Sequence, residues 1–362
     1  MAATHLSSGA TILVFAWEMG AGAALAPVVQ ALCRRGHRCL VRALPPGLDL
    51  LRNRCGESVE TAPWESKTCG GLVWDVALGG VGHPTWCPDG AAAWTEINRR
   101  GPTVGLMDSW KGLDRFLTPE GSLAEGLAPD RVAVMDEVSA SQLHRMGFPP
   151  WALRVTGHPG LEQFMSLEPE QWTALRSETR ARLGIAADVK VVLLASERLH
   201  DHKFHQRCGS GCRGIFFGRP GQDHLWEGIL AEERRDTPDV VVLMRPHPNE
   251  SGDRGGAVRM VTWGEADDRM MLAAADRVYG LSSMLLLQAA MLGKPVNNIR
   301  DRLDDWVPEN SLMQPETWRA WGGRLGAFPG IVSDVAYHSH RGAIAAVVDL
   351  VESLLVSGMT VN

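Results

Sequence analysis

Short apolar runs and amphipathic stretches alternate along most of the chain. The first apolar run covers residues 11–16, a glycine-containing turn follows over residues 17–23, and an amphipathic stretch covers residues 25–35. Gly36 suits the residue after a helix, and a second apolar run occupies residues 37–44. This order predicts a strand, a helix and a second parallel strand.

The same alternation continues to the end of the chain. Further strands and helices are predicted over residues 72–80, 91–100, 103–107, 131–135, 151–156, 168–183, 190–195, 225–235, 239–244, 258–263 and 267–275. Strands that alternate with helices predict the α/β class, here two Rossmann-like, doubly wound domains facing across a cleft. We expect an N-terminal domain over residues 1–158 and a C-terminal domain over residues 159–340, with a helix in residues 341–362 crossing back to the N-terminal domain.

A second strand–helix–strand pattern spans residues 275–296 and carries candidate chemistry. A short apolar run reaches Gly280, and Ser282 and Ser283 then precede a run of leucines. Hydroxyl side chains are preferred at the N-cap, so a helix is predicted to begin here and to end at Gly293. A helix that starts at the carboxyl end of a parallel strand binds anions through its free N–H groups and its dipole. The alternative is an ordinary capped helix with no ligand.

The strand predicted at residues 239–244 delivers Arg245-Pro246-His247-Pro248 to its carboxyl end. An arginine fork suits phosphate, and His247 can donate a hydrogen bond or a proton. In a doubly wound sheet both loops open on one edge, so we expect Arg245, His247, Ser282 and Ser283 to surround one diphosphate.

The N-terminal half also carries candidate site residues. Asp108 follows a predicted strand, which makes it either a base for a hydroxyl group or a helix-capping carboxylate. Gly20 and Gly22 lack the third glycine of a dinucleotide fingerprint and favour a turn that a substrate can approach closely. His158 either reaches a substrate phosphate or makes a structural bond at a hinge.

Composition and charge limit the classes of function. Of 362 residues, 45% are hydrophobic and 22% charged, which is ordinary for a globular protein. A net charge of −6 argues against a nucleic-acid partner, and no apolar run reaches the ~18 residues of a membrane span. The N-terminus lacks a positively charged signal region, and the seven scattered cysteines suit a reducing compartment. We therefore expect a cytoplasmic protein. A homodimer is compatible with the sequence.

A histidine- and cysteine-containing loop covers residues 200–212. Cys208 and Cys212 have an acceptable spacing for zinc, but His200, His202 and His205 precede them irregularly. We expect no metal here and favour a glycine-rich insertion that closes over a ligand or is partly mobile.

Taken with these motifs, the chain resembles the GT-B superfamily of nucleotide-sugar glycosyltransferases and UDP-N-acetylglucosamine 2-epimerases, in particular bacterial surface-glycan enzymes. The resemblance rests on residues 245–248, on Ser282-Ser283 with the helix that follows, and on residues 289–296 and 136–157. It implies a metal-independent transferase that moves a sugar from a UDP- or CMP-linked donor to a glycan or other hydroxyl acceptor, with no further cofactor. A nucleotide-sugar 2-epimerase or hydrolase is the alternative, and a non-catalytic nucleotide-sugar-binding protein in glycan assembly is the second.

The residue patterns and the resemblance together give the candidate site residues. The catalytic candidates are Asp108, His247 and Glu18. Candidates for binding the nucleotide and its phosphates are Arg245, Ser282, Ser283, Met284, Gln288 and Glu197. Candidates for binding substrate are Gly20, Gly22 and His158. Gln288 stands where many members have a glutamate that holds the ribose hydroxyls, and an amide bond there lacks charge assistance.

Overall fold

The computed structural model divides the chain into two compact units. Unit 1 contains Met1–Gln163 and His338–Asn362, and unit 2 contains Phe164–Tyr337. The residues that the structure describes are 9–45, 47–57, 59–65, 69–80, 82, 84, 87–109, 113–118, 121–196, 221–246, 258–280, 283–298 and 340–358. Among these residues no helix has the length and apolar character needed to cross a bilayer.

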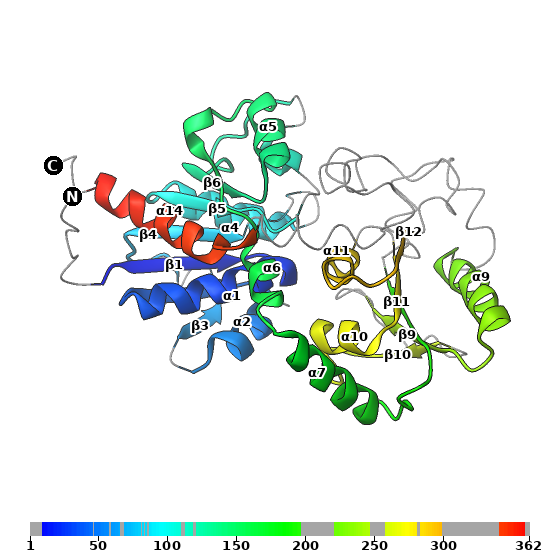
Figure 1. The fold of residues 1–362 in the computed structure, drawn as a ribbon. Helices are drawn as coiled ribbons and strands as arrows, with labels where there is room; N and C mark the ends of the chain where they lie inside the picture. Colours follow the sequence, from blue (N-terminus) through cyan, green and yellow to red (C-terminus); the bar gives the residue numbers. More distant parts are fainter. Residues whose placement is uncertain are drawn as a thin grey trace. The chain divides into compact units, whose positions relative to one another are not determined.

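Unit 1 is a parallel α/β sheet with helices packed on it (Figure 1). Its strands are β1 Thr11–Ala16, β2 Arg38–Ala43, β3 Glu60–Pro63, β4 Val76–Gly80, β5 Thr103–Leu106, β6 Arg131–Val134 and β7 Leu153–Val155. Its helices are α1 Met19–Arg34, α2 Gly47–Cys55, α4 Pro88–Asn98, α5 Glu137–Arg145, α6 Pro159–Phe164 and α14 Ala343–Gly358, with short 3₁₀ turns η1 Leu113–Phe116 and η2 Pro150–Ala152. The strand order is β3-β2-β1-β4-β5-β6-β7, so the sequence order reverses between β1 and β4.

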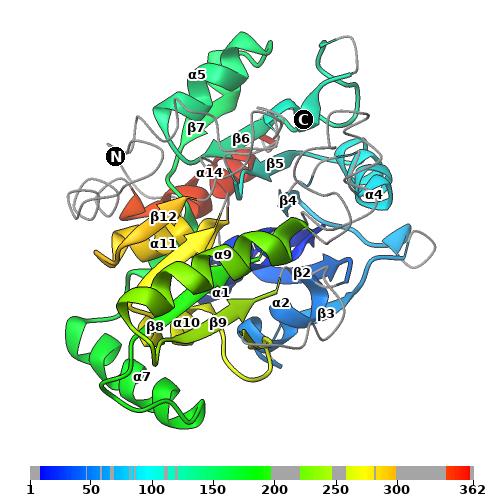
Figure 2. The same ribbon diagram turned by 90° about the vertical axis from the view of Figure 1, so that its right-hand side faces the viewer.

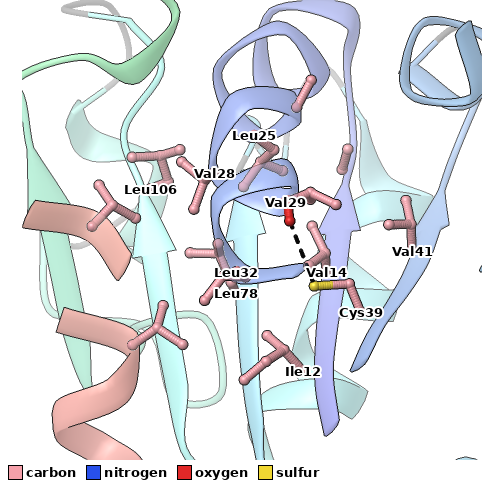
Figure 3. Packing of buried hydrophobic residues seen from close by; sticks show 14 of the residues in the cluster. Ile12, Val14, Leu25, Val28, Val29, Leu32, Cys39, Val41, Leu78 and Leu106 are labelled. Carbon is pink, nitrogen blue, oxygen red and sulfur yellow. Dashed lines mark hydrogen bonds between the residues drawn. The ribbon is translucent and has the colours of Figure 1, made fainter. Parts of the chain in front are cut away.

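The core of unit 1 shows how the sequence positions its helices. Alternate residues of β1, namely Ile12, Val14 and Ala16, point to the face that carries α1 and α14 (Figure 3). Successive glycines at the end of β4 allow close approach from both faces: an added Cβ on Gly79 would strike Trp94 of α4, and one on Gly80 would strike Ala21 of α1. Helices on opposite faces thus pack against the carboxyl end of β4.

Unit 2 is a second parallel sheet. Its strands are β8 Val191–Ala195, β9 Val241–Arg245, β10 Arg259–Met260, β11 Arg277–Gly280 and β12 Val296–Asn298, in the order β10-β9-β8-β11-β12. Its helices are α7 Pro169–Arg182, α9 Gly221–Asp236, α10 Asp268–Ala274 and α11 Met284–Met291. The order reverses between β8 and β11. The prediction of two doubly wound α/β sheets is therefore confirmed.

Helix α9 lies across the strands of unit 2 (Figure 2). A buried carboxylate of this helix bonds it to the sheet. Glu233 is 3% exposed and accepts hydrogen bonds from Lys190 Nζ at 2.7 Å, Arg277 Nη1 at 2.8 Å and Tyr279 Oη at 2.6 Å. Burial alone would raise the pKa of Glu233, but these three donors lower it. The buried charge is thus compensated by Lys190, which directly precedes β8, and by two residues of β11.

Candidate functional site

In unit 1 the candidate site is the switch point between β1 and β4, where doubly wound sheets bind ligands. Asp108 follows β5 and lies at this edge. Its Oδ1 is 3.4 Å from Nη1 of the buried Arg115. Its Oδ2 lies 2.9 Å from the position that a Cβ on Gly20 would occupy. The carboxylate therefore lies beside the first turn of α1, between a cation and the positive end of a helix.

Arg115 is a residue that sequence reasoning missed. It is 5% exposed and belongs to η1, seven residues after Asp108. A buried guanidinium beside a carboxylate at a strand end fixes the orientation of one carboxylate oxygen. Nothing in the spacing of the sequence distinguishes this arginine from the others nearby.

His158 was considered either as a phosphate ligand or as a structural hinge residue, and the structure gives it structural bonds. Its Nδ1 accepts a hydrogen bond from the Leu161 N–H at 3.2 Å, so the ring proton is on Nε2. This Nε2–H group donates a hydrogen bond to the Asp108 carbonyl at 3.0 Å. The side chain is buried, and burial lowers the pKa of His158 although Asp108 opposes that change. Both ring nitrogens are thus occupied by protein groups, which argues against the substrate-binding role.

The glycines of α1 also differ from expectation. The helix begins at Met19, so Gly20 and Gly22 lie in its first turn rather than in a loop. Gly20 is exposed and faces Asp108, whereas Gly22 is buried, with its Cβ position 3.3 Å from the Gly47 carbonyl of α2. Gly22 therefore allows α1 and α2 to pack closely. The prediction that a substrate approaches Gly22 is wrong. Only Gly20 stays a candidate for substrate contact.

Glu18 precedes α1 as its N-cap and is exposed. Its side chain makes no capping bond to the helix, and its Oε1 lies 3.1 Å from the Cβ position of Gly82. The carboxylate thus lies at the edge of the sheet near the ends of β1 and β4, which keeps it a candidate.

In unit 2 the switch point lies between β8 and β11, and α11 begins beside it. The extended Ser283 is the N-cap, and its Oγ accepts a hydrogen bond from the Leu285 N–H at 3.3 Å. The predicted helix start is therefore confirmed at Ser283. Gly280 ends β11 with its Cβ position 3.1 Å from Ala195 Cβ, so a side chain at this position would require Ala195 at the end of β8 to shift.

Two further expected ligands lie on α11. Met284 is its first residue and is partly buried. Gln288 is also partly buried, and its Oε1 is shielded from solvent without a hydrogen bond to any described residue. A buried acceptor of this kind costs free energy until a donor reaches it. The position expected to hold ribose thus carries an oxygen suited to a hydroxyl donor.

Arg245 departs from the prediction. Its side chain is 3% exposed, Nη1 donates to the Val261 carbonyl at 3.0 Å and Nη2 donates to the Ala266 carbonyl. Its Nε is 3.3 Å from Asp268 Oδ1, and the guanidinium stacks 4.4 Å above the Trp263 ring. Burial lowers the pKa of Arg245 while the neighbouring carboxylates oppose this. These contacts hold the end of β9 to the segment after β10. Arg245 therefore has a structural role in place of the expected contact with phosphate.

The remaining predictions concern residues outside the described ranges. They include His247, Ser282, Glu197 and the loop over residues 200–212. Within the described ranges, no group of three or more His, Cys, Asp or Glu side chains is arranged to hold a metal ion.

Comparisons with solved structures identify the fold. UDP-GlcNAc 2-epimerase from Neisseria meningitidis, bound to UDP-GlcNAc, matches 95% of this chain and 99% of its own with a TM-score of 0.61 at 16% identity. Alr3699/HepE from Anabaena, in complex with UDP-glucose, matches 96% and 100% with a TM-score of 0.55 at 15% identity. The wall teichoic acid polymerase TagF matches 96% and 89% with a TM-score of 0.53 at 11% identity.

No protein-family model and no curated protein sequence matches the chain. The structural matches extend over both units, and their enzymes use the GT-B architecture of two Rossmann-like domains. The chain therefore has the GT-B fold. At these identities the likeness shows the fold alone, and the function has to be argued from the sites.

Proposed function

We propose that the protein is an enzyme that uses a nucleotide-activated sugar and transfers that sugar to a hydroxyl acceptor. One observation carries the proposal: α11 starts at the β8–β11 switch point, with Ser283 as its cap, on a fold whose solved examples hold UDP-sugars. Helix starts at such points bind phosphate.

Unit 2 supplies the donor site in this proposal. The N–H groups at Ser283 and Met284 and the dipole of α11 stabilise the diphosphate, whose charge grows as the sugar leaves. Gln288 lies one turn into the helix, and its buried Oε1 accepts a hydrogen bond from a ribose hydroxyl. His247 keeps its expected catalytic role beside the departing phosphate, and Ser282 and Glu197 keep their expected roles in binding the nucleotide.

Unit 1 supplies the acceptor chemistry. Asp108 accepts the proton of the acceptor hydroxyl, whose oxygen forms a bond to the anomeric carbon of the sugar. The bond between that carbon and the phosphate oxygen breaks, and its electron pair leaves with the nucleotide. Arg115 orients Oδ1 of the base, and Gly20 leaves room for Oδ2. Glu18 is the second candidate base because it lies exposed at the same sheet edge.

Epimerisation at C2 of the sugar is the second candidate function. It is favoured by the names of two matched structures, the UDP-GlcNAc 2-epimerases from Neisseria meningitidis and Methanocaldococcus jannaschii. An epimerase would change the donor without any acceptor, so the two candidates predict different products.

The experiment uses the full-length protein with UDP-, CMP-, GDP- and TDP-sugars, each with and without hydroxyl acceptors. Transfer predicts nucleotide release that depends on the acceptor and falls on the order of 10²-fold or more in Asp108→Asn. An epimer formed from UDP-GlcNAc alone would replace transfer by the second candidate. Binding without turnover of any donor would contradict both and favour a nucleotide-sugar-binding protein.

A further inference from the structure

The chain leaves unit 1 after Gln163 and rejoins it at His338. The segments on either side of this excursion are bonded to each other within unit 1. Glu162 of α6 accepts hydrogen bonds from the Gly342 N–H at 2.8 Å and the Ile344 N–H at 2.7 Å, and so caps α14. The N–H of His158 donates to Nδ1 of His340 at 3.0 Å. Outgoing and returning chain thus meet at a set of contacts that we call the clasp: His158, Glu162, His340, Gly342 and Ile344.

The clasp extends to the candidate base. His158 holds the Asp108 carbonyl with Nε2, while its own backbone N–H is held by His340. Both imidazoles are buried, with His158 at 5% and His340 at 1% exposure. Asp108 follows Met107, whose N–H donates to the Ala133 carbonyl of β6 at 3.0 Å. The bond from His158 holds the backbone at Asp108 itself.

We propose that His158 is a positioning residue for Asp108, and that His340 on the returning chain sets the position of His158. This inference rests on the proposed function of Asp108. It also gives the C-terminal segment a part in catalysis. Helix α14 has to be packed on unit 1, with its start capped by Glu162, for Asp108 to keep its position. A displacement of about 1 Å at a catalytic group can cost on the order of 10²-fold in rate.

Two pairs of variants separate positioning from general stability. In His158→Gln the amide nitrogen reaches the place of Nε2 and keeps the bond to Asp108, whereas His158→Asn keeps only an acceptor for Leu161. In His340→Asn the side-chain oxygen replaces the Nδ1 acceptor, whereas His340→Leu removes it. Arg35→Ala is the control, because it removes the Asp349 and Glu352 contacts of α14 away from the clasp.

Hydrogen–deuterium exchange of the peptide carrying residues 107–109 is measured on each full-length variant, alongside turnover. His158→Asn and His340→Leu should speed exchange there at least several-fold and lower kcat about 10- to 100-fold with little change in donor KM. His158→Gln, His340→Asn and Arg35→Ala should stay close to the unmodified protein in both readouts.

Unchanged exchange at residues 107–109 in His158→Asn would overturn the positioning role, and so would an equal change in Arg35→Ala. If no nucleotide sugar is turned over by the unmodified protein, the proposed function fails, while the exchange measurement still decides whether His158 and His340 hold the Asp108 segment.

Discussion

Oδ2 of Asp108 lies 2.9 Å from the point that a β-carbon on Gly20 would occupy. Gly20→Ala should therefore rotate or displace the carboxylate and lower kcat about 10-fold or more. Stability should not suffer, since alanine in an exposed first helical turn is better than glycine by about 0.5–1 kcal/mol. Turnover and urea unfolding on the same preparation check both halves of the prediction.

Gly22→Ala is the matched control for that substitution. Gly22 is buried with its Cβ position 3.3 Å from the Gly47 carbonyl and 3.4 Å from Leu50 Cδ2, so a methyl group has to push α2 away. We expect stability to fall by about 1–3 kcal/mol. If Gly20→Ala and Gly22→Ala had the same effects on turnover and on stability, the contact between Gly20 and the Asp108 carboxylate would have no role in catalysis.

Gln288 offers a test of donor binding. Gln288→Leu removes the buried Oε1 and should weaken nucleotide binding about 10-fold, while Gln288→Glu supplies a charged acceptor and should strengthen it by a similar factor. Isothermal titration with UDP and CMP measures both. Equal affinities in all three proteins would remove Gln288 from the site.

Arg245 should behave as a structural residue. Arg245→Gln removes the guanidinium that contacts Asp268 and the carbonyls of Val261 and Ala266, and a buried acceptor that loses its donor typically costs about 1–3 kcal/mol. We expect reduced stability in urea and an unchanged donor KM at a temperature where the variant is folded. A large increase in KM without loss of stability would restore the phosphate role that the sequence suggested.

The stability of the protein should decline in mild acid through His340. Burial, with His158 nearby, lowers the pKa of His340 from 6.5 to about 3. Below pH 6.5 the unfolded chain therefore binds a proton that the folded chain does not, so the free energy of unfolding falls as pH falls, by about 1 kcal/mol per pH unit for this group. Urea unfolding between pH 7 and pH 5 should show a shallower pH dependence for His340→Asn. Identical slopes would show that His340 does not titrate in this way.

Strand positions could be predicted from sequence because parallel strands are buried on both faces. Residues 11–16 and 191–195 form β1 and β8 within a residue of the predicted bounds, since an apolar run of that length fits little else. The start of α1 could not be predicted from local preference. Glycines and Pro27 disfavour a helix locally, but close packing against α2 and β4 outweighs that preference.

The candidate site was partly predictable for the same reason. Asp108 lies two residues after the end of β5 and Ser283 directly precedes α11, so their place at a sheet edge follows from topology. The bond between His158 and His340 joins residues 182 positions apart and leaves no local pattern. The side chain of Arg245 was placed wrongly because a strand-end position fixes the backbone, whereas the contacts with Trp263 and Asp268 decide where the guanidinium lies.

The central claim is that the start of α11 binds the phosphates of a nucleotide sugar. The most direct measurement is a titration of isotope-labelled protein with UDP, CMP and their sugars, followed by amide chemical shifts. The account predicts the largest shifts at the amides of Ser283, Met284 and Leu285. Shifts confined to other elements, or none at millimolar nucleotide, would contradict it.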